Sequence, residues 1–148
     1  MQMMLLVILI GCGSIGLETT YDPSLSSGLE IEPMGTISFG NYDFGGDGGV
    51  ETMTLFSVGD KDLAIIDIWF GDRTDDEFDF NSDDLPLPLM LAPGENFPLN
   101  IAFMPDSVGN YDGEVWVLVD GPSGGQEVSR RLKGQGCDPQ SGSSSCQP

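Results

Sequence analysis

Apolar and polar residues alternate with a period of two through much of residues 30 to 136, which is the spacing of a half-buried β-strand. In residues 97 to 103 this alternation places the apolar side chains on one face, and we expect them in a core: Phe97, Leu99, Ile101 and Phe103. Pro98 has no backbone N–H to donate to a neighbouring strand. The strand is therefore predicted to begin near Pro98 or to lie at a sheet edge.

The stretch from residue 113 to residue 119 alternates less cleanly. Val115 and Val117 share one face, and we expect this pair in the core. Trp116 and Leu118 occupy the opposite face, although both are apolar. A strand that is apolar on both faces predicts a central position or a partly covered outer surface.

Glycine or proline punctuates the intervals between apolar stretches, and no window shows the 3.6-residue period of an amphipathic helix. In residues 63 to 70 the alternation changes phase near Ile66, which predicts a β-bulge. Six to eight short strands separated by turn residues predict an all-β, antiparallel sandwich.

The chain begins with an unbroken apolar run from Met3 to Ile10. Such a run is too short to span a bilayer as a helix, but it suits the apolar region of a secretion signal. The sequence Leu9-Ile10-Gly11-Cys12 resembles the lipobox of bacterial lipoproteins. The resemblance implies that residues 1 to 11 are a signal peptide and that Cys12 carries a covalent lipid. Met1-Gln2-Met3 lacks the basic residue usual in such signals, and an ordinary buried first strand is the alternative.

The same residues also form a G-x-G-x-x-G pattern, through Gly11, Gly13 and Gly16. This pattern binds a dinucleotide only where the last glycine opens a helix within a βαβ unit. Pro23 would lie inside that helix, at a cost of about 3 kcal/mol. The sequence therefore favours the secretion signal over a nucleotide site.

The chain contains three cysteines, Cys12, Cys137 and Cys146. An odd number in an exported protein calls for an explanation. If Cys12 carries lipid, Cys137 and Cys146 remain to form a disulfide, which suits an oxidising compartment. Two free thiols are the alternative. Two cysteines without histidine cannot complete a structural zinc site.

The charge is strongly acidic, since 24 Asp and Glu residues against five Lys and Arg residues give a formal net charge of −19. Binding to nucleic acid or to anionic lipid headgroups requires a basic surface, so both are excluded as partners. The chain has no histidine, which removes the commonest general base and metal ligand. We expect no catalytic residue and no cofactor.

Seven carboxylates lie between residues 72 and 84. The spacing of Asp79, Asn81 and Asp83 matches the start of a calcium loop, but Asp84 and Met90 occupy the positions of its required glycine and its bidentate glutamate. The segment is therefore predicted to be a solvated acidic edge strand and loop. The alternative is a weak, irregular Ca²⁺ site formed by Asp72, Asp75, Asp76, Asp79 and Asp83.

Several short segments occur in an order known from one family. They are Ile37-Ser-Phe39-Gly40, Leu63-Ala-Ile65, Leu91-Ala-Pro93-Gly94-Glu95, Ile101-Ala-Phe103-Met-Pro105, Gly109-Asn-Tyr111-Asp-Gly113 and Leu132-Lys-Gly134. Together they resemble the ASH or Hydin-like immunoglobulin-like domains and the related bacterial "choice-of-anchor D" domains. The resemblance implies a sandwich of seven or eight strands and no enzymatic activity. By analogy with the tyrosine corner, we expect the hydroxyl of Tyr111 to bond upstream backbone.

These features predict four segments: a signal peptide in residues 1–11, a lipidated cysteine and linker in 12–29, an immunoglobulin-like domain in 30–136, and a Ser/Gly-rich tail in 137–148. The expected function is a non-enzymatic, lipid-anchored binding or structural module of a bacterial cell envelope. Its expected location is the outer membrane, facing the periplasm or the cell surface, with a protein or another component of the envelope as partner. The alternative is a decoration domain of a virion or surface fibre without a lipid anchor.

Overall fold

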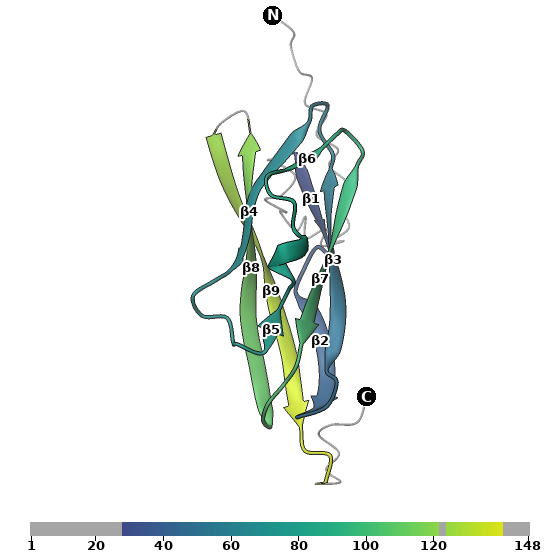
Figure 1. Ribbon diagram of the computed structural model, residues 1–148, viewed down its shortest axis with the longest axis vertical. Coiled ribbons are helices and arrows are strands. Elements are labelled where there is room, and N and C mark those ends of the chain that lie inside the picture. The colour runs from purple at the N-terminus through teal and green to yellow at the C-terminus, as the bar shows by residue number, and fades with distance from the viewer. Residues whose placement is uncertain (1–27, 122–123, 141–148) are drawn as a thin grey trace, which may run out of the picture.

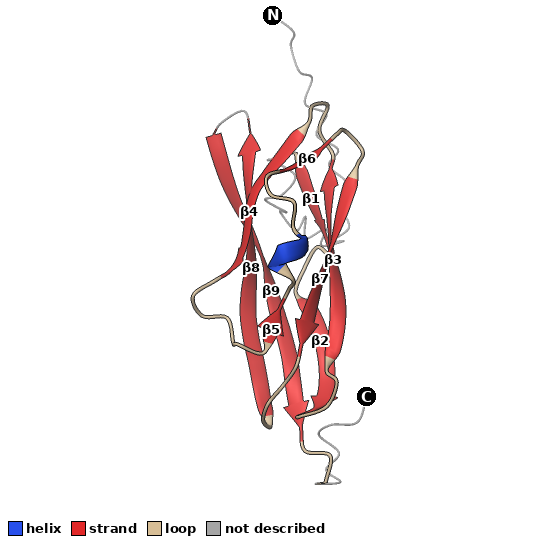
Figure 2. Cartoon of the chain, in the orientation of Figure 1, coloured by secondary structure: helices blue, strands red, loops and turns tan. Residues whose placement is uncertain are grey.

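The computed structural model describes residues 28–121 and 124–140, which form two β-sheets packed face to face (Figures 1 and 2). The four-stranded sheet has the order β1-β3-β7-β5, and the five-stranded sheet has the order β2-β9-β8-β4-β6. The strands are β1 (Leu29–Glu32), β2 (Ile37–Asp43), β3 (Gly49–Ser57), β4 (Leu63–Phe70), β5 (Phe78–Asp79), β6 (Leu89–Leu91), β7 (Asn96–Phe103), β8 (Gly109–Gly121) and β9 (Gly124–Cys137). The predicted all-β sandwich is confirmed.

The described residues form nine strands, where the resemblance implied seven or eight. The count includes two short strands, β5 and β6, on either side of a 3₁₀ turn at Ser82–Asp84. One pairing differs from the predicted antiparallel arrangement, since β2 runs parallel to β9. Alternation with a period of two is the same for either direction of a neighbouring strand, so it did not distinguish them. The β2–β9 register shifts between Ser38 and Asn41, where Gly40 has a φ of 75°.

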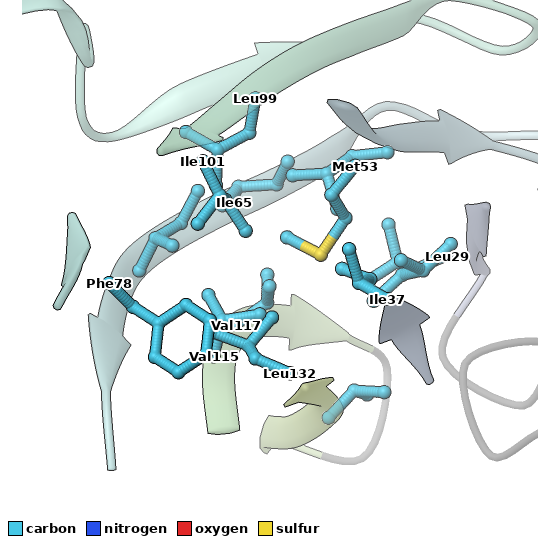
Figure 3. Packing of buried hydrophobic residues seen from close by; sticks show 14 of the residues in the cluster. Leu29, Ile37, Met53, Ile65, Phe78, Leu99, Ile101, Val115, Val117 and Leu132 are labelled. Carbon is cyan, nitrogen blue, oxygen red and sulfur yellow. The ribbon is translucent and has the colours of Figure 1, made fainter. Parts of the chain in front are cut away.

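The core lies between the sheets, and most of the predicted core positions are buried. Leu99, Ile101 and Phe103 of β7 and Val115 and Val117 of β8 are at most 4% exposed. In Figure 3, Leu99 and Ile101 extend from one sheet toward Val115 and Val117 of the other. Phe97 is only partly buried and packs against the edge of the core, because it lies near the start of β7.

Two local predictions about the strands are confirmed by the register. Pro98 pairs with Thr54 of β3, whereas β5 pairs only with the end of β7, at Ala102 and Phe103. On the β5 side, β7 has no paired strand at Pro98, so the missing N–H leaves no strand pairing incomplete there. In β4 the pairing passes from Ile65 to Asp67 and leaves Ile66 as the extra residue of a bulge.

A buried arginine links the two sheets near the first strand. Arg130 lies on β9 and is 6% exposed. Its guanidinium donates from Nη2 to the carbonyl oxygen of Ile31 at 3.2 Å and from Nε to that of Pro33 at 3.2 Å. Ile31 belongs to β1 and Pro33 follows it, so these bonds tie the link between β1 and β2 to the opposite sheet. No sequence pattern predicted a role for this residue.

Candidate functional site

Two tryptophans lie opposite each other on the outer face of the five-stranded sheet. The β4–β8 register pairs Trp69 with Trp116, and their rings lie 6.4 Å apart between centroids with an interplanar angle of 14°. The flanking residues Val115 and Val117 point inward and are fully buried, so Trp116 must point outward. Both indoles are half-buried. The outward face predicted for Trp116 thus carries a cross-strand aromatic pair.

The indole pair borders an open groove with a volume of about 570 Å³. The groove is formed by β4, β8 and β9 together with the loop that connects β4 to β5. Its charged lining residues are Asp72, Arg73, Asp112, Glu114, Glu127 and Arg131. Four carboxylates therefore face two guanidinium groups, so the lining is acidic overall.

Hydrogen bonds hold the β4–β5 loop against β8. The Thr74 hydroxyl donates to the Glu114 carbonyl at 3.0 Å and accepts from the Glu114 N–H at 3.0 Å. One residue further, the Asp75 N–H donates to the Asp112 carbonyl, and Oδ2 of Asp75 accepts from the Asp112 N–H at 2.7 Å. This network fixes one wall of the groove through backbone groups of β8.

Two glycines permit this close approach. At Gly113, an added Cβ would lie 2.6 Å from the Thr74 methyl group, so a side chain there would displace the loop. At Gly71, an added Cβ would lie 3.0 Å from Nε1 of Trp116. Glycine at position 113 therefore lets the loop lie close to β8. Glycine at position 71 leaves the edge of the Trp116 indole uncovered, because it has no side chain.

One ion pair lies within the groove. Nε of Arg131 is 4.0 Å from Oε1 of Glu114, and the two side chains are 73% and 41% exposed. A pair this exposed and this long contributes little to stability. Both charges therefore remain accessible to a ligand.

A second polar cluster surrounds Tyr111 at the start of β8. Its hydroxyl lies 3.1 Å from the Ser107 N–H, 3.0 Å from the Ser107 carbonyl oxygen and 3.1 Å from Oδ1 of Asp106. The bonds to upstream backbone agree with the role predicted for Tyr111. Tyr111 is buried, and its ring packs edge-on against Phe103 of the core.

The same cluster shifts the pKa values of two carboxyl groups. Hydrogen bonds from Ser107 and Tyr111 lower the pKa of the exposed Asp106. Burial is the main cause that raises the pKa of the neighbouring Glu77, and the carboxylates of Asp106 and Asp75 add to it.

The five carboxylates of the alternative calcium site have different surroundings. Asp72 lines the groove and Asp75 bonds the backbone of β8. Asp79 is exposed on β5, an edge strand whose other residue, Phe78, is buried in the core. Across the described part of the chain, no three His, Cys, Asp or Glu residues form a group that could hold a metal ion. Binding of Ca²⁺ to this segment stays a prediction for solution measurements.

The predicted lipidation and disulfide sites involve the chain ends. Cys12 and Cys146 lie outside the described residues. Cys137 is the last residue of β9 and is 1% exposed. The Cys137–Cys146 disulfide stays a prediction. No helix among residues 28–121 and 124–140 is long and apolar enough to cross a membrane.

No family model and no curated protein matches the chain, but solved structures share its fold. The VesB protease of Vibrio cholerae matches with a TM-score of 0.62 and 15% identity over 76% of this chain, which spans 33% of VesB. The ASH/PapD-like domain 7 of human CEP192 matches with a TM-score of 0.56 and 16% identity, covering 93% of this chain and 99% of that domain. The YadV chaperone matches with a TM-score of 0.52 and 14% identity, over 74% of this chain and 52% of YadV.

These likenesses, together with the two-sheet topology, define the class. The chain forms an immunoglobulin-like, PapD-like β-sandwich of nine described strands. Identities near 15% establish the fold and leave activity and partners to be argued from the site itself.

Proposed function

We propose that the protein is a non-enzymatic binding module that a lipid on Cys12 tethers to a bacterial cell envelope, with the outer membrane as its location. The observation that carries the binding role is the groove beside Trp69 and Trp116. Large aromatic side chains that remain accessible on a rigid sheet are typical of interaction sites. The site therefore serves recognition, and the sandwich acts as its support.

The groove is built in advance of any ligand. Thr74 and Asp75 bind backbone groups of β8 and hold one wall, and the Trp69–Trp116 pair rests on two adjacent strands. A preorganised surface loses little conformational freedom on binding. The hydroxyl of Thr74 is occupied by the backbone of Glu114, so it is unsuited to act as a nucleophile.

The N-terminal sequence supports the lipid anchor. An apolar run ends in Leu9-Ile10-Gly11-Cys12, and the first described strand begins at Leu29. A core cluster of buried residues is assembled from strands between Leu29 and the end of β9. Residues 13 to 28 would then connect the lipid to the folded domain.

Mass spectrometry of the protein expressed in a Gram-negative bacterium tests the anchor. We expect a mature chain that begins at Cys12 and carries acyl chains, recovered with the membrane fraction. The Cys12→Ser variant should lack the lipid. A Gln2→Lys variant supplies the basic residue that the signal lacks. Lipidation in this variant but not in the wild type would show a weak signal, and lipidation in neither would show that residues 1 to 11 are not a signal. An intact Met1 on soluble wild-type and Gln2→Lys protein would contradict the anchor and favour the decoration domain.

A further inference from the structure

We propose that the outer face of the five-stranded sheet docks a basic segment of a partner protein, with Trp69 and Trp116 at the centre of the contact. This inference rests on the binding function proposed above and adds the chemistry of the ligand. It follows from the shape of the face, from its apolar residues and from its charge.

The apolar surface extends beyond the tryptophan pair. Leu118 lies on the same side of β8 as Trp116, because the two are separated by one residue. On β4 the bulge residue Ile66 is 41% exposed. Met90 of β6 pairs with Ala64 of β4 and is 56% exposed. We call Ile66, Trp69, Met90, Trp116 and Leu118 the apolar strip.

Acidic residues accompany the apolar strip. Asp67 pairs with Leu118, and Asp120 pairs with Ala64. In the groove at the other end of the strip, four carboxylates face two guanidinium groups. The surface therefore combines accessible indole and aliphatic groups with an excess of negative charge.

This combination selects a cationic segment over other occupants. Lysine and arginine heads are attracted both to carboxylates and to the faces of indole rings, and their aliphatic stems cover apolar surface. A second copy of the chain would bring another net charge of −19 against the first, and like charges facing each other across an interface oppose association. An anionic lipid surface is disfavoured for the same reason.

The two tryptophans make the site directly observable. Trp69 and Trp116 are the only tryptophans of the chain, and both border the groove. Indole emission of the full-length protein therefore reports on this face alone. The probe is a short labelled peptide in which Lys alternates with Leu. A peptide with Glu in place of Lys and a soluble neutral oligosaccharide are compared with it.

Variants separate a specific site from general attraction to an acidic protein. The double variant Asp72→Asn, Glu127→Gln removes two charges from the groove. The control Glu30→Gln, Glu51→Gln removes two charges from the four-stranded sheet, where β1 and β3 carry them. The Trp116→Phe variant removes one indole, and its melting temperature shows whether it is folded.

We expect the Lys/Leu peptide to bind with a change in indole emission, and the groove variant to bind it about tenfold more weakly than the control. The Trp116→Phe variant should also bind more weakly, and the Glu/Leu peptide should not bind. Equal weakening in both charge variants, or binding without a change in emission, would overturn the proposal. A change in emission only with the oligosaccharide would also overturn it and leave the binding function intact. The lipid anchor is judged separately by the mass of the mature N-terminus.

Discussion

Nη2 of Arg130 donates a hydrogen bond to the carbonyl oxygen of Ile31, a residue 99 positions earlier in the chain, at 3.2 Å. Nε of the same guanidinium donates to Pro33, the residue that follows β1. A cation inside a sandwich is stable only when its hydrogen bonds are satisfied. The last strand, β9, and the first strand, β1, belong to different sheets and do not pair with each other. The Arg130 side chain thus joins them.

Replacing this arginine should destabilise the protein. Arg130→Met removes the bonds to Ile31 and Pro33 and leaves the buried carbonyl group of Ile31 without this donor, so the free energy of unfolding should fall by about 2–4 kcal/mol. Arg131→Met is the matched control, because Arg131 follows Arg130 on β9, is exposed and makes a long contact with Glu114. We expect this control to change stability by less than about 1 kcal/mol. Urea denaturation measures both, and equal effects would refute a structural role for Arg130.

Truncation in β7 should create a cavity at the centre of the core. Leu99 is 4% exposed and Ile101 is fully buried, so Leu99→Ala or Ile101→Ala should lower the free energy of unfolding by about 2–5 kcal/mol. Val50→Ala provides a control on the adjacent strand β3, since Val50 is 61% exposed. A cost for Ile101→Ala no greater than for Val50→Ala would show that β7 is not central to the core.

Neutralising Glu77 should stabilise the protein at neutral pH. Burial, with help from Asp106 and Asp75, raises the pKa of Glu77 above its ordinary value of 4.5, so the folded state favours the protonated form. Above the raised pKa, ionised Glu77 therefore opposes folding, and Glu77→Gln should raise the melting temperature by about 1–2 °C. The gain should shrink as the pH falls through the raised pKa and should be absent below 4.5.

Asp76, the exposed carboxylate next to Glu77 in the chain, provides the control for this effect. Asp76→Asn removes the same charge from the same loop. The lowered pKa of Asp106 affects stability in the opposite direction to the raised pKa of Glu77. Ionised Asp106 stabilises the folded state at neutral pH, and this contribution to stability is lost on acidification in both variants. If Asp76→Asn gives the same gain with the same pH dependence, reduced net charge accounts for the result and the environment of Glu77 does not.

Salt should raise the melting temperature, because a net charge of −19 on a small domain causes self-repulsion. We expect calcium and magnesium at matched concentration to act alike, as general screening predicts. The structure brings no three carboxylates of the described chain into a metal-binding group. A gain of several degrees specific to calcium and lost in Asp79→Asn would instead establish the alternative site.

The cysteine pair calls for a test that does not depend on access to the thiols. Cys137 is 1% exposed, so failure to label it in the folded protein carries no information about a disulfide. We therefore expect Cys137 and Cys146 to resist alkylation in denaturant until a reductant is added. Alkylation of both without reductant would contradict the predicted bond. A Cys146→Ser variant should leave the sandwich folded, because Cys137 is the last residue of β9.

Local sequence alone determined the fold class and part of the core. The two-residue period identified Leu99, Ile101, Val115 and Val117 as buried because side-chain direction in a strand alternates whatever its neighbours are. Pro98 indicated the start of the strand or an edge for a similar reason, since a missing N–H is a property of the residue itself, and β7 begins at Asn96. The hydroxyl contact of Tyr111 was predicted by analogy with the tyrosine corner of immunoglobulin domains.

The tertiary structure decided what depends on the pairing of distant strands. The parallel β2–β9 pair, the burial of Arg130 and the groove at Trp69 and Trp116 each join segments that the period of one strand cannot relate. Trp116 was recognisable as outward-facing, but its partner on β4 was not, because the pattern within one strand does not say which strand lies beside it or in what register. Register is set by the whole sheet, and the register brings the two indoles together at the groove.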